Sequence, residues 1–81
     1  MAQYYFHFKK GDRLAIDDEG QDLPHFSAAV REAELAAREL LADAIKARKP
    51  KVPEAVVITD ASGNELYSIP LSAVLPEPLK R

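Results

Sequence analysis

Residues 26–48 have the sequence FSAAVREAELAARELLADAIKAR, and this stretch decides the fold. Its apolar residues recur at the i, i+3, i+4, i+7 spacing of an amphipathic α-helix, at Phe26, Val30, Ala33, Ala37, Leu40, Leu41 and Ala44. Ser27 is a suitable N-cap, because its hydroxyl can accept from a free backbone N–H of the first turn. Pro50 ends the helix because it has no backbone N–H. At 1.5 Å per residue, the predicted helix is about 33 Å long.

Strand patterns flank the predicted helix on both sides. Residues 4–8 (YYFHF) are dense in aromatic side chains, which favour strands, and residues 13–16 (RLAI) return after a turn that contains Gly11. On the other side, residues 55–59 (AVVIT) and 66–69 (LYSI) are joined by a loop in which Gly63 suits a left-handed backbone conformation. Residues 17–24 are predicted to form an acidic loop, and residues 71–75 a single helical turn.

These elements predict an α+β fold of the order ββαββ. The simplest assembly is one antiparallel four-stranded sheet with the long helix packed on one face. A chain of 81 residues makes one hydrophobic core, so we expect a single domain over residues 1–75. Residues 76–81 are predicted to be a flexible C-terminal tail.

The predicted sheet has a second face that the helix leaves uncovered. Residues two apart in a strand share a face, so Phe6 and Phe8 point one way and Tyr5 and His7 the other. We expect the uncovered face to carry five residues, which form a possible interface: Tyr5, His7, Val57, Thr59 and Leu66. The alternative is that the helix covers this face, or that these side chains simply meet water.

The order and spacing of several short segments carry a family resemblance. They are residues 4–8 (YYFHF), 11–12 (GD), 17–20 (DDEG), 23–24 (LP) and 60–70 around Gly63 and Pro70, with the Ala-, Glu- and Arg-rich helix between them. In this order the chain resembles the bacterial domain-of-unknown-function 6894 family over residues 4–75. The resemblance implies the same fold and implies no activity, ligand or catalytic residue. The chain departs from the expected pattern at His25-Phe26, where an acidic residue would stand at the helix entrance.

The charge balance bears on nucleic-acid binding. Lys9, Lys10 and Arg13, with the basic cluster at residues 46–51, could contact phosphates, and Tyr5 could stack on a base. However, the net charge of −2 and the pI of about 5.6 oppose the electrostatic attraction on which such binding depends. Hairpin tips and helix ends are also ordinary places for solvated lysines. We therefore expect no nucleic-acid partner, although this alternative stays open.

Candidate catalytic and metal-binding residues are few. His7 could act as a general base or a metal ligand, but a histidine within an aromatic strand is more often a hydrogen-bonded structural residue. The acidic residues around Gly20 (Asp17, Asp18, Glu19 and Asp22) could offer oxygen ligands, but their spacing does not match a calcium loop. The sequence has no nucleophile elbow and no phosphate-binding glycine loop. We expect no catalytic residue, no metal, no cofactor and no small-molecule ligand.

Composition also indicates a cellular location. There is no cysteine, no signal-peptide pattern at the N-terminus, and no apolar run near the ~20 residues of a membrane span. We expect a cytoplasmic protein. Our leading hypothesis is a non-catalytic protein–protein interaction module that forms a homodimer, or pairs with a partner protein, through a sheet face or edge. The alternatives are a nucleic-acid-binding accessory protein and a His- or metal-dependent enzyme.

Overall fold

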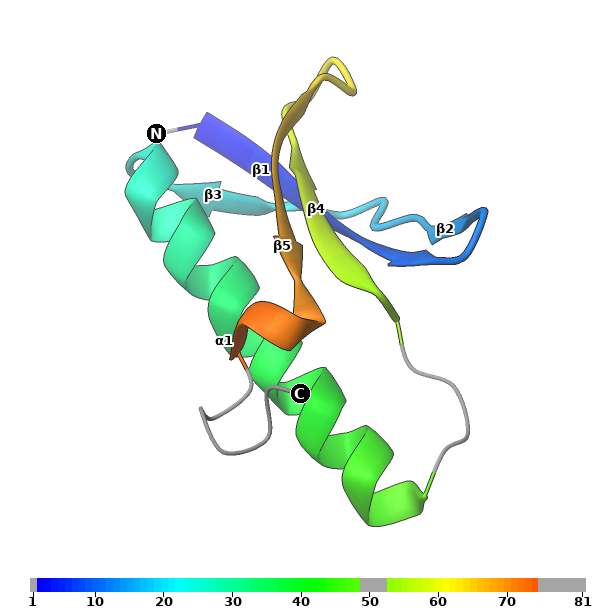
Figure 1. Cartoon of the computed structure of the whole chain (residues 1–81). Helices are drawn as coiled ribbons and strands as arrows, with labels where there is room; N and C mark the ends of the chain where they lie inside the picture. The colour runs from blue at the N-terminus through cyan, green and yellow to red at the C-terminus, as the bar shows by residue number, and fades with distance from the viewer. Residues whose placement is uncertain (1, 49–52, 75–81) are drawn as a thin grey trace.

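The computed structural model describes residues 2–48 and 53–74 and confirms an antiparallel sheet with one helix packed on it (Figure 1). The strands β2 (Arg13–Ala15), β1 (Ala2–Lys10), β4 (Ala55–Thr59) and β5 (Glu65–Pro70) lie side by side in that order, and a fifth short strand, β3, also pairs with β1. This fifth strand, Gln21–Leu23, falls within the segment for which we predicted only a loop. The predicted tail at residues 76–81 lies outside the described residues.

β1, Ala2–Lys10, is the central strand and the longest one. On one side it pairs with β4, Ala55–Thr59, with Phe6 opposite Ile58. On the other side its two halves have different partners, β3 beside its first residues and β2, Arg13–Ala15, beside its last. Residues 16–20 connect β2 to β3 and leave the ladder, so the middle of β1 has no strand on this side.

The helix α1, Phe26–Ala47, begins and ends close to the predicted positions, but its N-cap is different. His25 is the cap, and its Nδ1 accepts a hydrogen bond from the Ala28 N–H at 3.2 Å. The prediction of Ser27 was wrong because the helix already includes this residue, and Ser27 Oγ instead lies 2.8 Å from His25 Nδ1. At the other end, Arg48 adopts a left-handed conformation, and its N–H bonds to carbonyls of the last turn.

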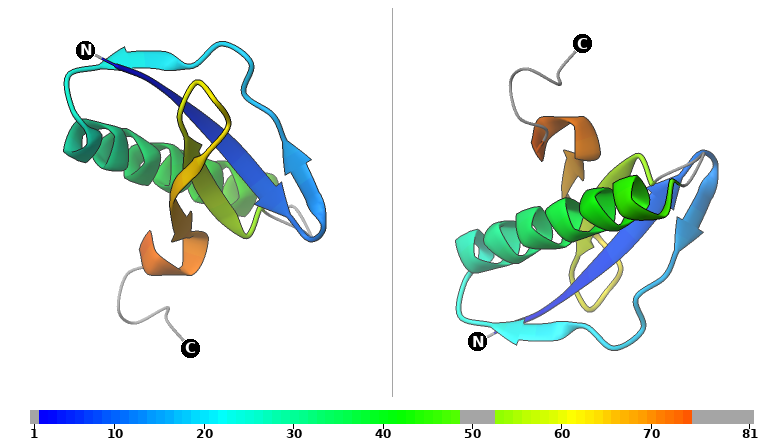
Figure 2. Two further views of the ribbon diagram at one scale, coloured as in Figure 1. Left: turned by 90° about the horizontal axis from the view of Figure 1, so that it is seen from above. Right: turned by 90° about the horizontal axis from the view of Figure 1, so that it is seen from below.

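The core lies between α1 and one face of the sheet (Figure 2). Ala29, Ala33 and Ala37 are fully buried on the helix, and their small side chains let α1 come close to the strands. The strands and the segment after them supply the larger core residues, which are Tyr4, Phe6, Val56, Ile58, Ile69 and Leu71. Burial of each large side chain stabilises the fold by about 1.5–3 kcal/mol. Tyr4 and Phe6 alternate along β1 on the face that meets the helix, whereas β4 is buried on both faces.

The second hairpin supplies the strand at the other end of the sheet. β5, Glu65–Pro70, pairs with β4 and is followed by a 3-10 turn, η1, at Leu71–Val74. In the connecting loop, both the Ser62 and Asn64 N–H groups donate to Asp60 Oδ1 at 2.9 Å. Gly63 has a φ of 87°, as the turn chemistry predicted. The predicted helical turn at 71–75 is confirmed over residues 71–74, and Leu75 lies outside the described residues.

Candidate functional site

The face of the sheet opposite the helix carries the predicted interface residues, and most of them are covered. Tyr5 pairs with Thr59 and His7 with Val57 on neighbouring strands, as expected for residues that share a face. However, His7, Val57 and Thr59 are each at most 7% exposed. The expectation that these three are uncovered was wrong. Tyr5 is half-buried, and only Leu66 is largely exposed.

His7 is held by two hydrogen bonds in the centre of this face. Its Nδ1 accepts from the Asp17 N–H at 2.9 Å, and its Nε2 lies 3.0 Å from Thr59 Oγ1. Because Nδ1 is an acceptor, the ring proton sits on Nε2 and is donated to the threonine hydroxyl. Both ring nitrogens are therefore occupied by partners within the chain. This geometry makes His7 a structural residue that joins β1, β4 and the connection at residues 16–20.

Asp17 anchors that connection to the free side of β1. Its Oδ2 accepts from the Phe6 N–H at 3.1 Å, and its Oδ1 accepts from the Glu19 and Gly20 N–H groups at 3.2 Å. Partial burial raises the pKa of Asp17, but the hydrogen bonds from the Phe6, Gly20 and Glu19 N–H groups outweigh it and lower the pKa below the usual 3.8. The Asp17 carboxylate therefore takes the place of a strand partner for the middle of β1.

Gly20 brings the end of the connection against Tyr5. It has a φ of +72°, and a Cβ added here would lie 2.9 Å from Tyr5 Cε2 and 3.0 Å from the Tyr4 carbonyl oxygen. The Tyr5 ring in turn stacks near the His7 ring, with centroids 6.4 Å apart and planes inclined by 15°. Residues 16–20 therefore cover Tyr5 and His7, and only glycine fits at the point of closest approach.

Two residues of the predicted acidic loop, Asp17 and Asp22, have structural roles in the fold. Asp17 binds three backbone N–H groups, and Asp22 lies in β3 opposite Gln3. Within residues 2–48 and 53–74, no group of three His, Asp or Glu side chains is placed to hold a metal ion. The geometry of Asp17 accounts for this carboxylate without a ligand.

The basic residues suggested for nucleic-acid contact do not share one face. Lys9 and Lys10 are neighbours in β1 and point to opposite sides of the sheet, and Arg13 pairs with Lys10 in the ladder at the end of the first hairpin. Lys9 and Arg13 also line a shallow concavity of about 240 Å³ together with the acidic residues Asp12 and Glu65. Mixed charge of this kind gives no continuous positive surface for a phosphate backbone.

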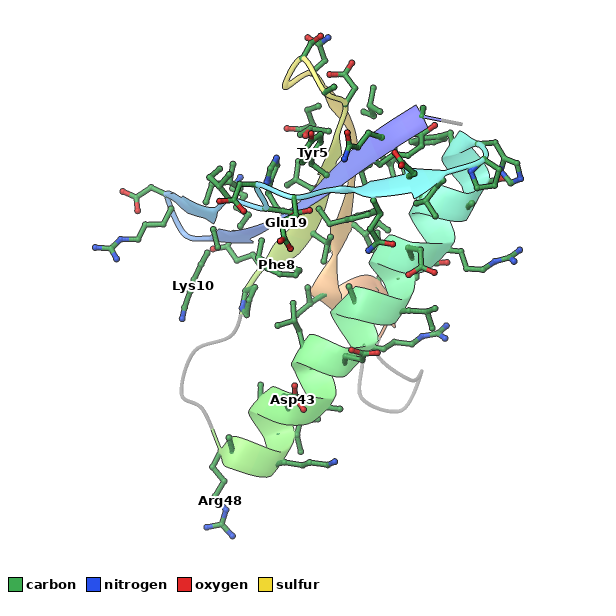
Figure 3. All side chains as sticks on the ribbon, turned by 180° about the vertical axis from the view of Figure 1, so that it is seen from behind. Tyr5, Phe8, Lys10, Glu19, Asp43 and Arg48 are labelled. Carbon is green, nitrogen blue, oxygen red and sulfur yellow. The ribbon has the colours of Figure 1, made fainter. Side chains whose placement is uncertain are left out.

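An open groove lies on the helix side of the sheet, between α1 and the β1–β2 hairpin. Its volume is about 470 Å³, and its lining residues are Phe6, Phe8, Ala15, Ile16, Asp17, Gln21, Glu32, Leu35, Ala36 and Glu39. Figure 3 shows Phe8 between the hairpin and the helix. The apolar residues Ile16 and Leu35 are 65% and 43% exposed. The groove is therefore an apolar feature of the described surface that the core leaves open.

Sequence reasoning missed this groove, although a signal for it exists. Leu35 is the one leucine of the helix that lies outside the buried stripe, and it faces the groove. Ile16 was assigned to a strand, but it stands where the chain leaves the ladder after β2. Neither residue could be placed beside the other without the tertiary structure.

Among the described helices, none has both the length and the apolar character to cross a bilayer. The fold and the covered His7 cluster define a small α+β domain in which a single helix packs on an antiparallel sheet. The model of the family described as "Domain of unknown function (DUF6894)" matches residues 3–72, and the chain belongs to this family. No curated protein and no solved structure matches the chain.

Proposed function

We propose that the protein is a small non-catalytic protein–protein interaction module that self-associates by pairing the outer edges of β5. Support comes from the position of β5 at the end of the sheet, where no described strand pairs with its outer side. A free edge presents unpaired N–H and C=O groups, which a second copy can satisfy in a two-fold arrangement. A cytoplasmic location belongs to this proposal, because a chain without cysteine suits a reducing compartment.

The side chains around β5 favour this edge. Leu66 and Tyr67 are 41% and 49% exposed, and the Phe26 ring meets the Tyr67 ring edge-on with centroids 6.1 Å apart. Phe26 and Tyr67 form an exposed apolar pair beside the free edge, and Leu66 is an exposed apolar residue of the same strand, which suits a contact surface. The opposite edge of the sheet is less suited, because β2 and β3 are only three residues each and residues 16–20 interrupt them.

Ser68→Lys tests the proposal. Ser68 is an exposed residue of β5 opposite Val57, and a lysine there places two like charges near the two-fold axis of an edge-paired dimer. We expect the dissociation constant, measured by sedimentation equilibrium, to rise at least about tenfold. Ser62→Lys, which makes the same change in the loop before β5, is the matched control and should leave the dimer unchanged.

Two results would contradict the proposal. One is a clean monomer of the unaltered protein at high micromolar concentration by light scattering. The other is equal behaviour of the Ser68→Lys and Ser62→Lys proteins. A dimer lost in Tyr5→Glu but kept in Ser68→Lys would move the interface from the edge to the sheet face, provided that the altered chain stays folded by circular dichroism.

A further inference from the structure

The groove between α1 and the β1–β2 hairpin exists because the helix covers only part of its sheet face. α1 packs chiefly on β4 and also contacts β5, β3 and η1. The β1–β2 end of the same face is left with Phe8 half-buried and Ile16 exposed. Figure 2 shows β2 lying to one side of the helix in the view from below. In a domain with so small a core, an apolar groove that stays open indicates a binding surface.

The charged residues in the described lining of the groove are all acidic. Asp17, Glu32 and Glu39 are among its lining residues, and no lysine or arginine of residues 2–48 and 53–74 lines it. Glu32 and Glu39 are two turns apart on the same side of α1, and Asp43 continues this side one turn further. Figure 3 shows Asp43 on the helix between Phe8 and Arg48. A row of carboxylates therefore borders an apolar floor.

The apolar floor and the acidic border together indicate the chemistry of the partner. We propose that the groove binds a segment of another protein that presents branched apolar side chains flanked by lysine or arginine. The apolar side chains would pack on Phe8, Ile16 and Leu35, and the cationic groups would meet the carboxylates at the border. The surface is separate from the β5 edge, so this proposal goes beyond self-association.

Other occupants fit the charges less well. A phosphate backbone would be repelled by the three carboxylates. A second copy bound in a two-fold contact through this groove would bring Glu32 and Glu39 of both chains together, which like-charge repulsion opposes. The cations within α1, which are Arg31, Arg38 and Lys46, lie outside the lining. A basic apolar segment of a different protein is the occupant that the groove favours.

The test uses a pair of peptides as probes. One is an amphipathic peptide of about 12 residues built from leucine and lysine, and the other has glutamate in place of every lysine. We expect the lysine peptide to bind the full chain in a fluorescence anisotropy titration, and the glutamate peptide not to bind. Raising the salt concentration from about 50 mM to about 300 mM should weaken the binding.

Two charge reversals on α1 locate the binding. Glu39→Lys removes a border carboxylate, and Glu34→Lys makes the same change of net charge at an exposed position outside the lining. We expect Glu39→Lys to weaken lysine-peptide binding at least about tenfold, and Glu34→Lys to change it less than about twofold. Circular dichroism of both variants shows that each is folded before its affinity is compared.

A spectrum gives a second readout that does not depend on the variants. In ¹H–¹⁵N correlation spectra, the lysine peptide should shift the amide signals of Phe8, Ile16 and Leu35 and leave those of β5 in place. Equal effects of Glu39→Lys and Glu34→Lys, signal changes confined to regions outside the groove, or no binding of the lysine peptide at millimolar concentration would overturn the proposal. Since Ser68→Lys acts on the dimer and Glu39→Lys on the peptide, failure of one proposal is distinguishable from failure of the other.

Discussion

His7 and Phe8 are neighbours in β1 and point to opposite faces of the sheet, yet the polar residue is covered and the aromatic one is half-open. His7 is 7% exposed, because residues 16–20 fold over it and its two ring nitrogens find partners. Phe8 faces the helix side, but α1 lies chiefly over β4 and leaves the β1–β2 end free. The comparison shows that chain connectivity, and not side-chain hydrophobicity alone, decides which surface is sealed.

Gly20→Ala, on the covered side of the sheet, should lower the stability of the fold the most. The new Cβ would approach Tyr5 Cε2 to 2.9 Å in a backbone conformation that alanine disfavours. We expect the free energy of unfolding, from urea denaturation, to fall by about 2–4 kcal/mol. Gly63→Ala, with a φ of +87° but nothing within 4 Å of the added Cβ, is the control and should cost only about 1–2 kcal/mol. Equal losses in both variants would show that residues 16–20 do not press on Tyr5.

His7→Leu should have the next largest effect. The change leaves the Asp17 N–H and the Thr59 hydroxyl without their buried partner, and we expect a loss of about 2–3 kcal/mol in urea denaturation. Thr59→Val added to His7→Leu should recover part of the loss, because it removes one of the two unpaired groups. Ile16→Gln on the open side should change stability by less than about 0.5 kcal/mol. If Ile16→Gln lowered the free energy of unfolding more than His7→Leu, the idea that His7 is on the covered side and Ile16 on the open side would be contradicted.

Asp17→Asn should have a smaller effect on stability than Gly20→Ala or His7→Leu, and its signature is the pH dependence. Because the pKa of Asp17 is lowered in the folded chain, the unfolded chain binds this proton more tightly. The stabilisation is complete above the ordinary pKa of 3.8 and is lost as the pH falls through the lower folded pKa. We expect Asp17→Asn to cost about 1 kcal/mol at pH 7, and its urea midpoint to fall less than that of the unaltered protein between about pH 5 and pH 2.

Asp60 is the control for the acid transition. Its pKa is lowered by backbone and side-chain hydrogen bonds from Asn64, followed by those of the loop amides, and these hydrogen bonds lie at the surface. We expect Asp60→Asn to flatten the pH dependence less than Asp17→Asn does, because solvent screens an exposed group. If Asp60→Asn removed more of the acid sensitivity, the anchoring role of Asp17 would be contradicted.

The periodic parts of the chain were predictable, and the irregular parts were not. The helix at residues 26–48 and the two hairpins follow from local spacing, because a 3.6-residue or two-residue period is visible in the sequence itself. The strand at Gln21–Leu23 was missed, because three residues are too few to show a period and its partner is distant in sequence. The capping role of His25 was misassigned to Ser27, because the first helical residue is not marked in the sequence.

The candidate surfaces also have features that the sequence predicts and features that it does not. Sequence alternation placed Tyr5, His7, Val57 and Thr59 on one face, and the pairing of β1 with β4 agrees. Alternation says nothing about what covers a face, so three of the five expected interface residues turned out to be buried. The groove joins Ile16 of the first hairpin to Leu35 of the helix, and only the position of α1 over β4 decides that they stay open.

By itself the sequence determined the elements, their order and the faces of the central strands, because these depend on interactions between residues that are near in the chain. The tertiary structure decided how Asp17 ties residues 16–20 to β1 and where α1 stops covering the sheet. Both depend on contacts between residues that are distant in the sequence or on the packing of one element across another. Such contacts have no period, so they appear only when the chain is folded.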